Sequence, residues 1–313
     1  MCCGKMKKSG LYVLLTVLLA FGDLAAQEVS FPDYNSMRDS IGIRLEQWEQ
    51  AHGCPDMNTV RANTRRDMRP DNRVTVASLP VPRKKALTGP RLYDLCKQSS
   101  LVVCQYQRHP QGQPFRWSVM ASAVALTADG VCATNYHVFY DVVLTGMLCS
   151  TVPNPMVNFV MTADGRFFPL ESILAADPVN DFIIFKVDTG GDSLVPMPLG
   201  NQPDEGETVY SLAHPQGYLF YLTQGIVSRN HTITNRMTGV KKLETQVTAE
   251  YAVGASGGPM IDRFGNLAGL VSSTSTIYPN PQVPQNQQML IKSTVPLRLI
   301  KECLIVEKKG GKR

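Results

Sequence analysis

The chain has 313 residues, of which 43% are hydrophobic and 18% are charged. This length is ample for a sizeable core but too short for many domains. The composition excludes a wholly disordered chain. The formal net charge of +5 is mild and gives no argument by itself for binding to nucleic acid.

The N-terminus has the features of an export signal. Three lysines within the first eight residues precede an apolar run over residues 11–21, which is too short to span a bilayer. Small residues follow, and we expect cleavage between Ala26 and Gln27. We therefore predict a signal peptide over residues 1–26 and an exported protein, periplasmic or secreted, with no stable membrane span after cleavage. An uncleaved signal anchor is the alternative.

Two segments with different compositions follow the leader. Residues 27–50 are polar, with an amphipathic stretch that is predicted to form a short helix whose apolar side chains Ile41, Ile43, Leu45 and Trp48 share one face. Residues 53–92 are rich in arginine and proline and have few apolar runs, which is typical of a flexible basic linker or propeptide. An arm that binds nucleic acid or an anionic surface, or a processing site, is the alternative. The solvated tether is favoured, so no nucleic-acid partner is expected.

The cysteines beyond the leader are even in number, which permits disulfides in an exported chain. We expect a Cys132–Cys149 bridge around His137, and Cys96–Cys104 is the next candidate pair. The alternative is that several thiols are small buried hydrophobes. No cysteine or histidine spacing matches a zinc site, so no metal is expected. The full set of cysteines is Cys54, Cys96, Cys104, Cys132, Cys149 and Cys303.

From Tyr93 onward the pattern is typical of β-structure. Asp164-Gly165 separates two β-type runs and predicts a hairpin, because both residues tolerate positive φ. The Gly/Pro-rich segment 190–206 predicts a crossing between two halves, residues 294–304 have helical spacing, and the basic tail 306–313 is expected to fray. Many short strands favour an all-β sandwich or barrel without deciding between them. The predicted strands cover residues 119–127, 131–134, 157–161, 166–170, 182–187, 208–213, 225–229, 242–248, 259–261 and 267–273.

Three short motifs together indicate nucleophilic catalysis. Ser256 lies in the glycine-rich turn 254–259, His137 follows a strand-like run, and Asp181 ends the turn 177–181. A serine nucleophile needs a base, and the resulting imidazolium needs a carboxylate to orient and stabilise it. Taken alone, each of these residues would have a structural role, in packing, in a turn or as a cap, at least as often as a catalytic one. Their combination, in the order His, Asp, Ser, favours a catalytic triad.

Four stretches of the chain resemble the trypsin-fold (chymotrypsin-like) serine proteases, and within that group the bacterial HtrA/DegP type. The resemblance implies two six-stranded antiparallel β-barrels, about 93–190 and 195–290, with a short C-terminal helix and an active site between the barrels. A protease domain over 93–305 is therefore expected. HtrA-type enzymes usually carry a PDZ module, but few residues follow Cys303, so none is expected here. The matching stretches are 130–138, 164–187, 209–228 and 254–270.

The resemblance also implies the role of each site residue. Ser256 would attack the scissile carbonyl, His137 would act as base and then acid, and Asp181 would orient the imidazole. The backbone N–H groups of Gly254 and Ser256 would form the oxyanion hole. Such an enzyme needs no metal or organic cofactor. We expect an exported serine endopeptidase that acts through an acyl-enzyme on protein or peptide substrates, unfolded ones included; an oligomer is compatible with this reading.

Specificity is predicted from position. Glu250 precedes Ser256 by six residues, where trypsin-like enzymes place the floor of the S1 pocket, so it could pair with a substrate Arg or Lys. The alternative is an exposed loop glutamate, because HtrA pockets usually accept aliphatic residues. A catalytically silent homologue that binds peptides in the same cleft is the competing hypothesis. The edge expected to pair with substrate backbone consists of Val271, Ser272, Ser273 and Thr274.

Overall fold

A computed structural model describes residues 29–69, 71–107, 116–140, 156–280, 282 and 285–307. The predicted leader 1–26, Cys149 and the end of the basic tail lie outside the described residues. The chain divides into two compact units, residues 1–33 and 34–313, and the structure below is that of the second. Among the described helices, none is both long and apolar enough to cross a membrane.

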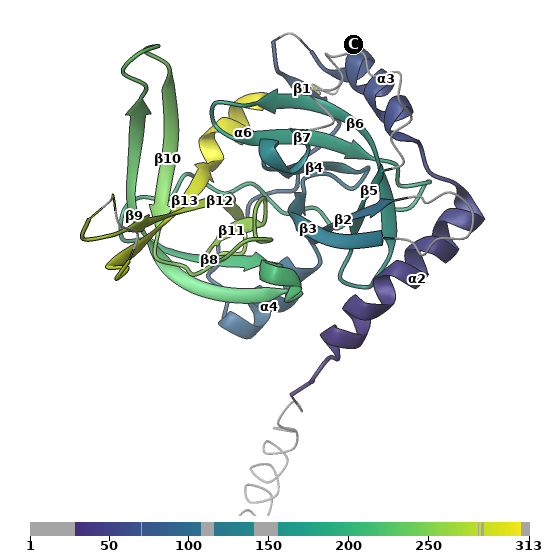
Figure 1. The fold of residues 1–313 in the computed structure, drawn as a ribbon, viewed down its shortest axis with the longest axis horizontal. Helices are drawn as coiled ribbons and strands as arrows, with labels where there is room; N and C mark the ends of the chain where they lie inside the picture. Colours follow the sequence, from purple (N-terminus) through teal and green to yellow (C-terminus); the bar gives the residue numbers. More distant parts are fainter. Residues whose placement is uncertain are drawn as a thin grey trace, which may run out of the picture. The chain divides into compact units, whose positions relative to one another are not determined.

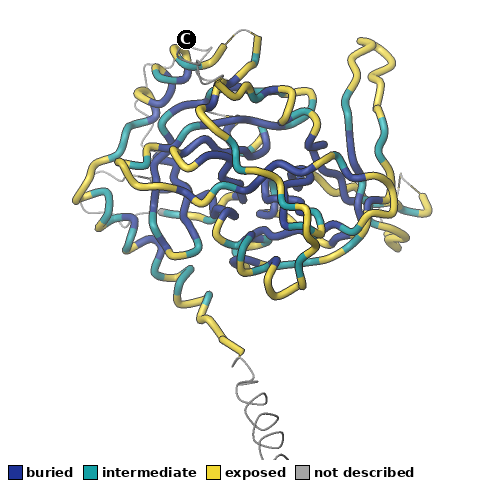
Figure 2. The backbone as a smooth tube through the Cα atoms, turned by 180° about the vertical axis from the view of Figure 1, so that it is seen from behind, coloured by how far each residue is buried: buried dark blue, intermediate teal, exposed yellow. Residues whose placement is uncertain are grey.

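The second unit contains two closed barrels, each of six antiparallel strands (Figure 1), which confirms the predicted fold class. Buried backbone is concentrated in the strands of both barrels (Figure 2). The first barrel, ordered β2-β3-β4-β7-β6-β5, consists of β2 (Ser100–Gln107), β3 (Arg116–Ala125), β4 (Val131–Thr134), β5 (Met156–Met161), β6 (Phe167–Asp177) and β7 (Phe182–Val187). The second, ordered β10-β13-β12-β11-β8-β9, consists of β8 (Thr208–Ala213), β9 (Tyr221–Thr234), β10 (Lys241–Val247), β11 (Pro259–Asp262), β12 (Leu267–Ile277) and β13 (Met289–Pro296).

The largest difference from the predicted strands is in the second barrel. β9 and β10 form a hairpin much longer than expected, which projects from the barrel in Figure 1 and carries an exposed tip that includes Met237. The helix predicted over 294–304 begins three residues later, as α6 (Leu297–Cys303). Thr294 instead lies in β13, where it pairs with Thr245 of β10 and Val271 of β12. The strand pairing that closes the second barrel therefore determines the conformation of Thr294, and the helical spacing of the apolar residues does not.

The N-terminal helix packs on the first barrel with one apolar stripe. α2 (Tyr34–His52) buries Ile41 and Leu45, and the Trp48 ring meets the Phe159 ring edge-on at 5.6 Å. Ile43 was predicted on the same face, which is wrong, because it is 63% exposed. Residues three and four apart share a helix face, whereas residues two apart do not.

The arginine-rich segment expected to be a flexible linker is ordered from 53 to 69 and from 71 to 92. It forms α3 (Met57–Asp67), β1 (Val74–Val76) and the start of α4 (Gly89–Lys97). α3 buries Val60 against the first barrel, and β1 pairs in parallel with β14 (Leu304–Val306). The Arg83 guanidinium donates to the carbonyl of Gly265 at 2.5 Å. Buried apolar side chains, strand pairing and a side-chain hydrogen bond thus hold this segment on the barrels, although its average composition is typical of a flexible linker.

The expected Cys96–Cys104 disulfide is wrong. Both thiols are free and buried, and burial raises the pKa of each to about 12. Cys132, the described half of the other expected bridge, is also free and buried, and burial raises its pKa. Thiols with raised pKa are poor nucleophiles, so these cysteines act as small buried hydrophobes, the alternative considered from the sequence.

Substitutions in β1 test whether the N-terminal extension is part of the fold. Val74 is buried and belongs to the core shared with the barrels, whereas its neighbour Thr75 is exposed. Val74→Asp would bury an unpaired carboxylate and should lower the free energy of unfolding by about 3 kcal/mol or more. Thr75→Asp, the matched control, should change it by less than about 0.5 kcal/mol. Equal denaturant midpoints for the two variants would show that the extension is not anchored.

Candidate functional site

The predicted triad residues come from three loops at the meeting point of the barrels. His137 lies in the short 3₁₀ helix η1 (Tyr136–Val138) that follows β4. Asp181 ends the turn between β6 and β7, and Ser256 lies in the turn before β11. Hydrogen bonds join the first two directly, and both Asp181 and Ser256 bond to Ser272 on β12.

The Asp181 carboxylate is held by donors from both barrels. His137 Nδ1 lies 3.0 Å from each of its oxygens, and the His137 backbone N–H donates to Oδ1 at 3.1 Å. The Ser272 hydroxyl donates to Oδ2 at 2.8 Å. Burial by itself would raise the pKa of Asp181, but the hydrogen bonds from His137 and Ser272 outweigh it and hold the pKa below its usual value. Because an ionised carboxylate only accepts, Nδ1 carries the proton and Nε2 is left as a base.

The turn that presents Asp181 is itself strained and braced. Asp181 has φ of +60°, a left-handed conformation that non-glycine residues rarely adopt. Asn135 Nδ2 donates to the Asp181 carbonyl at 2.9 Å, which ties the turn to the residue just before η1. The backbone N–H of Leu243 on β10 donates to Asn180 Oδ1 at 2.9 Å. Contacts from both barrels therefore fix the position of Asp181.

Ser256 lies beside this pair without being bonded to the imidazole. Its hydroxyl donates to the carbonyl of Ser272 at 3.4 Å. Both side chains lie in described segments, and no hydrogen bond joins Ser256 to His137 there. Catalytic hydrogen bonds are often long or misaligned before substrate binds. Rotation of the Ser256 hydroxyl away from Ser272 would make it available to the free Nε2 of His137.

The Ser256 turn leaves two backbone donors unused. The N–H of Ala255 donates to Ala252 O at 3.0 Å, and that of Gly257 donates to Val271 O at 2.8 Å. The N–H groups of Gly254, just before Ala255, and of Ser256, just after it, have no acceptor among the described residues. Gly254 has φ of +92°, which favours glycine. Two free N–H groups beside a serine hydroxyl are the components of an oxyanion hole.

A buried network under the turn joins it to the first barrel. Ser122 of β3 donates its hydroxyl to Gly254 O at 3.0 Å and its N–H to Ser256 O at 2.8 Å. The same hydroxyl accepts from the backbone N–H of His214 at 3.0 Å. His214 lies just before η2 (Pro215–Gly217), and burial lowers its pKa to about 3, so it is a neutral structural residue at physiological pH. No sequence motif marked Ser122 or His214 for this role.

The predicted specificity residues separate into two groups. β12 pairs with β11 only as far as Leu270 and continues against β13. Val271 exchanges backbone hydrogen bonds with Gly257 and Gly258 of the Ser256 turn, so the other edge has no partner strand among the described residues only from Ser272 onward. Ser273 and Thr274 are exposed on this edge. Glu250 does not close the floor of a pocket: its side chain is 73% exposed, and its carboxylate lies 3.0 Å from Lys292 Nζ.

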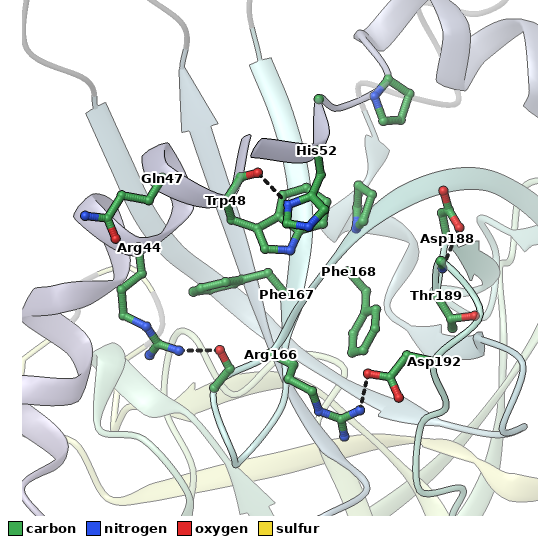
Figure 3. A pocket seen from close by; sticks show the side chains of 15 residues that line it. Arg44, Gln47, Trp48, His52, Arg166, Phe167, Phe168, Asp188, Thr189 and Asp192 are labelled. Atoms are coloured by element: carbon green, nitrogen blue, oxygen red, sulfur yellow. Dashed lines mark hydrogen bonds and ion pairs between the residues drawn. The ribbon is translucent and has the colours of Figure 1, made fainter. Parts of the chain in front are cut away.

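The structure also has a cavity of about 650 Å³ that none of the triad residues lines. It lies between α2, which contributes Arg44 and Trp48, and the region of β6 that contributes Phe167 and Phe168 (Figure 3). The Arg166 guanidinium pairs with Asp192 across its floor at 2.6 Å. Its cations are bonded to protein groups, and it contains no nucleophile beside a base.

No group of three or more His, Cys, Asp or Glu side chains in the described part of the chain could hold a metal ion.

Comparison with known sequences agrees with this geometry. Residues 121–270 match the family profile described as a trypsin-like peptidase domain. The chain is 31% identical over 150 residues to "Protease Do-like 5, chloroplastic" of Arabidopsis thaliana, which covers 47% of this chain and 46% of that protein. It is 24% identical over 263 residues to "Probable periplasmic serine endoprotease DegP-like" of Ectopseudomonas mendocina (strain ymp), covering 84% and 48%. The chain thus spans about half the length of these curated relatives.

A solved structure supports the fold. "HtrA-type protease AlgW with decapeptide" superposes with a TM-score of 0.52 at 20% sequence identity, covering 70% of this chain and 69% of that one. At this identity the likeness shows the fold, which is the two-barrel arrangement described above.

Two glycine substitutions test how tightly the Ser256 turn is packed. A Cβ on Gly257 (φ +77°) would overlap the Ser122 carbonyl and the Thr134 side chain, whereas one on Gly239 (φ +71°) would meet nothing within 4 Å. Gly257→Ala should therefore lower the free energy of unfolding by about 3 kcal/mol. Gly239→Ala should lower it by about 1 kcal/mol, from φ strain alone. Urea unfolding measures both, and equal losses would contradict the packing described here.

The lowered pKa of Asp181 predicts a specific pH dependence of stability. An unfolded aspartate titrates near pH 4, so the Asp181 contribution is complete above about pH 4 and is lost as pH falls through the lower folded pKa. Asp181→Asn removes this contribution. The gap in unfolding free energy between wild type and variant should be widest above about pH 4 and should narrow progressively as the pH falls below about 4 in urea titrations. A gap that stays constant with pH would contradict the assigned hydrogen bonds.

Proposed function

The chain is an HtrA-like protein with the trypsin fold, and from this premise we propose that it is an exported serine endopeptidase that cleaves proteins or peptides through an acyl-enzyme. The observation that carries the proposal is the Asp181 carboxylate between His137 Nδ1 at 3.0 Å and Ser272 Oγ at 2.8 Å, with Ser256 bonded to the same Ser272. This arrangement supports the proposal because it orients the imidazole through Nδ1 and leaves Nε2 without a partner among the described residues, while the N–H groups of Gly254 and Ser256 are without an acceptor there.

In the proposed mechanism Ser256 Oγ attacks the scissile carbonyl carbon while its proton passes to His137 Nε2. The Asp181 carboxylate stabilises the imidazolium that forms and keeps its tautomer fixed. The imidazolium then gives the proton to the leaving amine, the C–N bond breaks, and an ester remains on Ser256. Water then attacks the ester carbonyl carbon while one of its protons passes to His137 Nε2. The imidazolium returns this proton to Ser256 Oγ as the ester C–O bond breaks, which releases the carboxylic acid product.

Two features of the fold support the binding of a substrate in this geometry. The N–H groups of Gly254 and Ser256 are available to the oxygen that becomes negative in the tetrahedral intermediate. The edge of β12 from Ser272 to Thr274, which has no partner strand among the described residues, can accept an extended peptide as an added strand. An extended backbone is required, so unfolded proteins and exposed loops are the substrates that fit.

Export is proposed from the N-terminal sequence, with its three early lysines, apolar run and small residues before Gln27. The names of the relatives include a periplasmic and a chloroplastic protein, which supports a compartment outside the cytosol. The buried cysteines Cys96, Cys104, Cys132 and Cys303 are nevertheless free, so the fold does not depend on disulfides among them.

The direct test is hydrolysis of casein by the purified 27–313 chain beside single-residue variants. Ser256→Ala should lower the rate by a factor on the order of 10⁶, because the nucleophile is lost. Asp181→Asn should lower it by about 10⁴, because Nδ1 would lose its acceptor and the imidazole its tautomer. Fragments identified by mass spectrometry report the cleavage sites.

The matched control is Ser275→Ala, which removes an exposed hydroxyl from the same strand as Ser272 and should leave the rate unchanged. Equal hydrolysis by the wild type and Ser256→Ala would exclude the proposed chemistry. If neither hydrolyses casein and a fluorophosphonate does not label Ser256, the catalytically silent peptide-binding homologue is the correct reading.

A further inference from the structure

The second barrel contains a buried lysine, Lys292, that the proposed mechanism does not use. Lys292 lies in the middle of β13, and its side chain is 3% exposed. Its ammonium donates to the carbonyl of Tyr251 and lies 4.9 Å from the centre of the Tyr251 ring. A buried ammonium needs an opposite charge, because removing it from water is costly.

Lys292 obtains this charge from an exposed group. Its one carboxylate partner among the described residues is Glu250, 3.0 Å away, whose side chain is 73% exposed. The other acid of this region, Glu244, is already bonded to His231 at 3.2 Å and to Gln246 at 2.8 Å. An ion pair with one exposed member is weak and exchangeable. Another carboxylate could therefore replace Glu250 without leaving a buried charge unpaired.

A short chain of contacts connects Lys292 to the strand that bonds to the proposed nucleophile. Ser256 Oγ bonds to the carbonyl of Ser272, and the next carbonyl along β12, that of Ser273, accepts from the Tyr251 hydroxyl at 3.2 Å. Successive strand residues are about 3.3 Å apart. The following residue, Thr274, is the register partner of Lys292. The backbone of Lys292 thus pairs with the strand on which a substrate would pair, two residues beyond the carbonyl that accepts from Ser256. Its ammonium contacts Tyr251, whose hydroxyl bonds to the same strand.

We propose that Lys292 selects substrates with an acidic side chain immediately before the scissile bond, whose carboxylate replaces that of Glu250 on the Lys292 ammonium. This rests on the proposed function. It reverses the expectation that Glu250 selects Arg or Lys, because a cationic side chain would meet the buried ammonium of Lys292. A neutral Gln side chain has nearly the shape of Glu without its charge. The ratio of kcat/KM for the Glu peptide to that for the Gln peptide therefore isolates the interaction of the substrate carboxylate with the Lys292 ammonium.

The test measures kcat/KM for fluorogenic peptides that differ only at this position, with Glu, Asp, Gln, Val or Arg. Glu or Asp should exceed Gln by at least about tenfold, and Arg should be the poorest. Glu250→Gln removes the competing carboxylate and should raise kcat/KM for Glu several-fold. Lys292→Met should abolish the preference for Glu over Gln, and Lys241→Met, at an exposed lysine of β10, should leave it intact.

Fluorophosphonate labelling of Ser256 separates the two hypotheses. If Ser256 is labelled and peptides are cleaved without preference for Glu over Gln, the specificity proposal is wrong and the proteolytic function stands. If Ser256 is not labelled and no peptide is cleaved, both fail. Should Lys292→Met not fold, Glu250→Gln decides alone, since Glu250 is exposed: an unchanged kcat/KM for the Glu peptide overturns the proposal.

Discussion

The site depends on one carboxylate that accepts hydrogen bonds from both barrels. Asp181 belongs to the first barrel and bonds to His137 of the same barrel, but its second oxygen accepts from Ser272 of the second. A single, partly buried charge thus orients the imidazole and fixes the strand that would hold the substrate. Ser122 makes the matching connection beneath the Ser256 turn, with bonds to Gly254 and Ser256. The two barrels therefore cannot separate at this junction without breaking both sets of hydrogen bonds.

Much of this could be predicted from local sequence. The glycine-rich turn around Ser256 and the turn that ends at Asp181 are short motifs whose backbone demands are visible in their residue types. The all-β fold followed from regularly spaced β-type runs and turn residues. The ends of the strands, by contrast, depend on pairing between strands that are distant in the sequence. Thr294 and its neighbours read as helix because of their apolar spacing, but the second barrel needs them as the end of β13.

The features that sequence reasoning missed share one property: they depend on contacts between residues far apart in the chain. The arginine-rich extension resembles a tether by composition, yet Val74 and Val76 pair with β14 near the other end of the chain. Lys292 has no neighbouring motif, and its partners Glu250 and Tyr251 come from a different loop. Ser272 was expected to contact substrate through its backbone, and only the structure shows its hydroxyl on Asp181. Burial and pairing of this kind cannot be read from composition or periodicity.

The central claim is that this junction is a serine protease site, with Ser256 as nucleophile and two backbone N–H groups as its oxyanion hole. A crystal structure after reaction with a peptidyl phosphonate tests it most directly. The account predicts a covalent bond from phosphorus to Ser256 Oγ, a phosphonyl oxygen that accepts from the N–H groups of Gly254 and Ser256, and a peptide paired with the edge of β12. A phosphonate attached elsewhere, or one on Ser256 whose oxygen points away from both N–H groups, would contradict it.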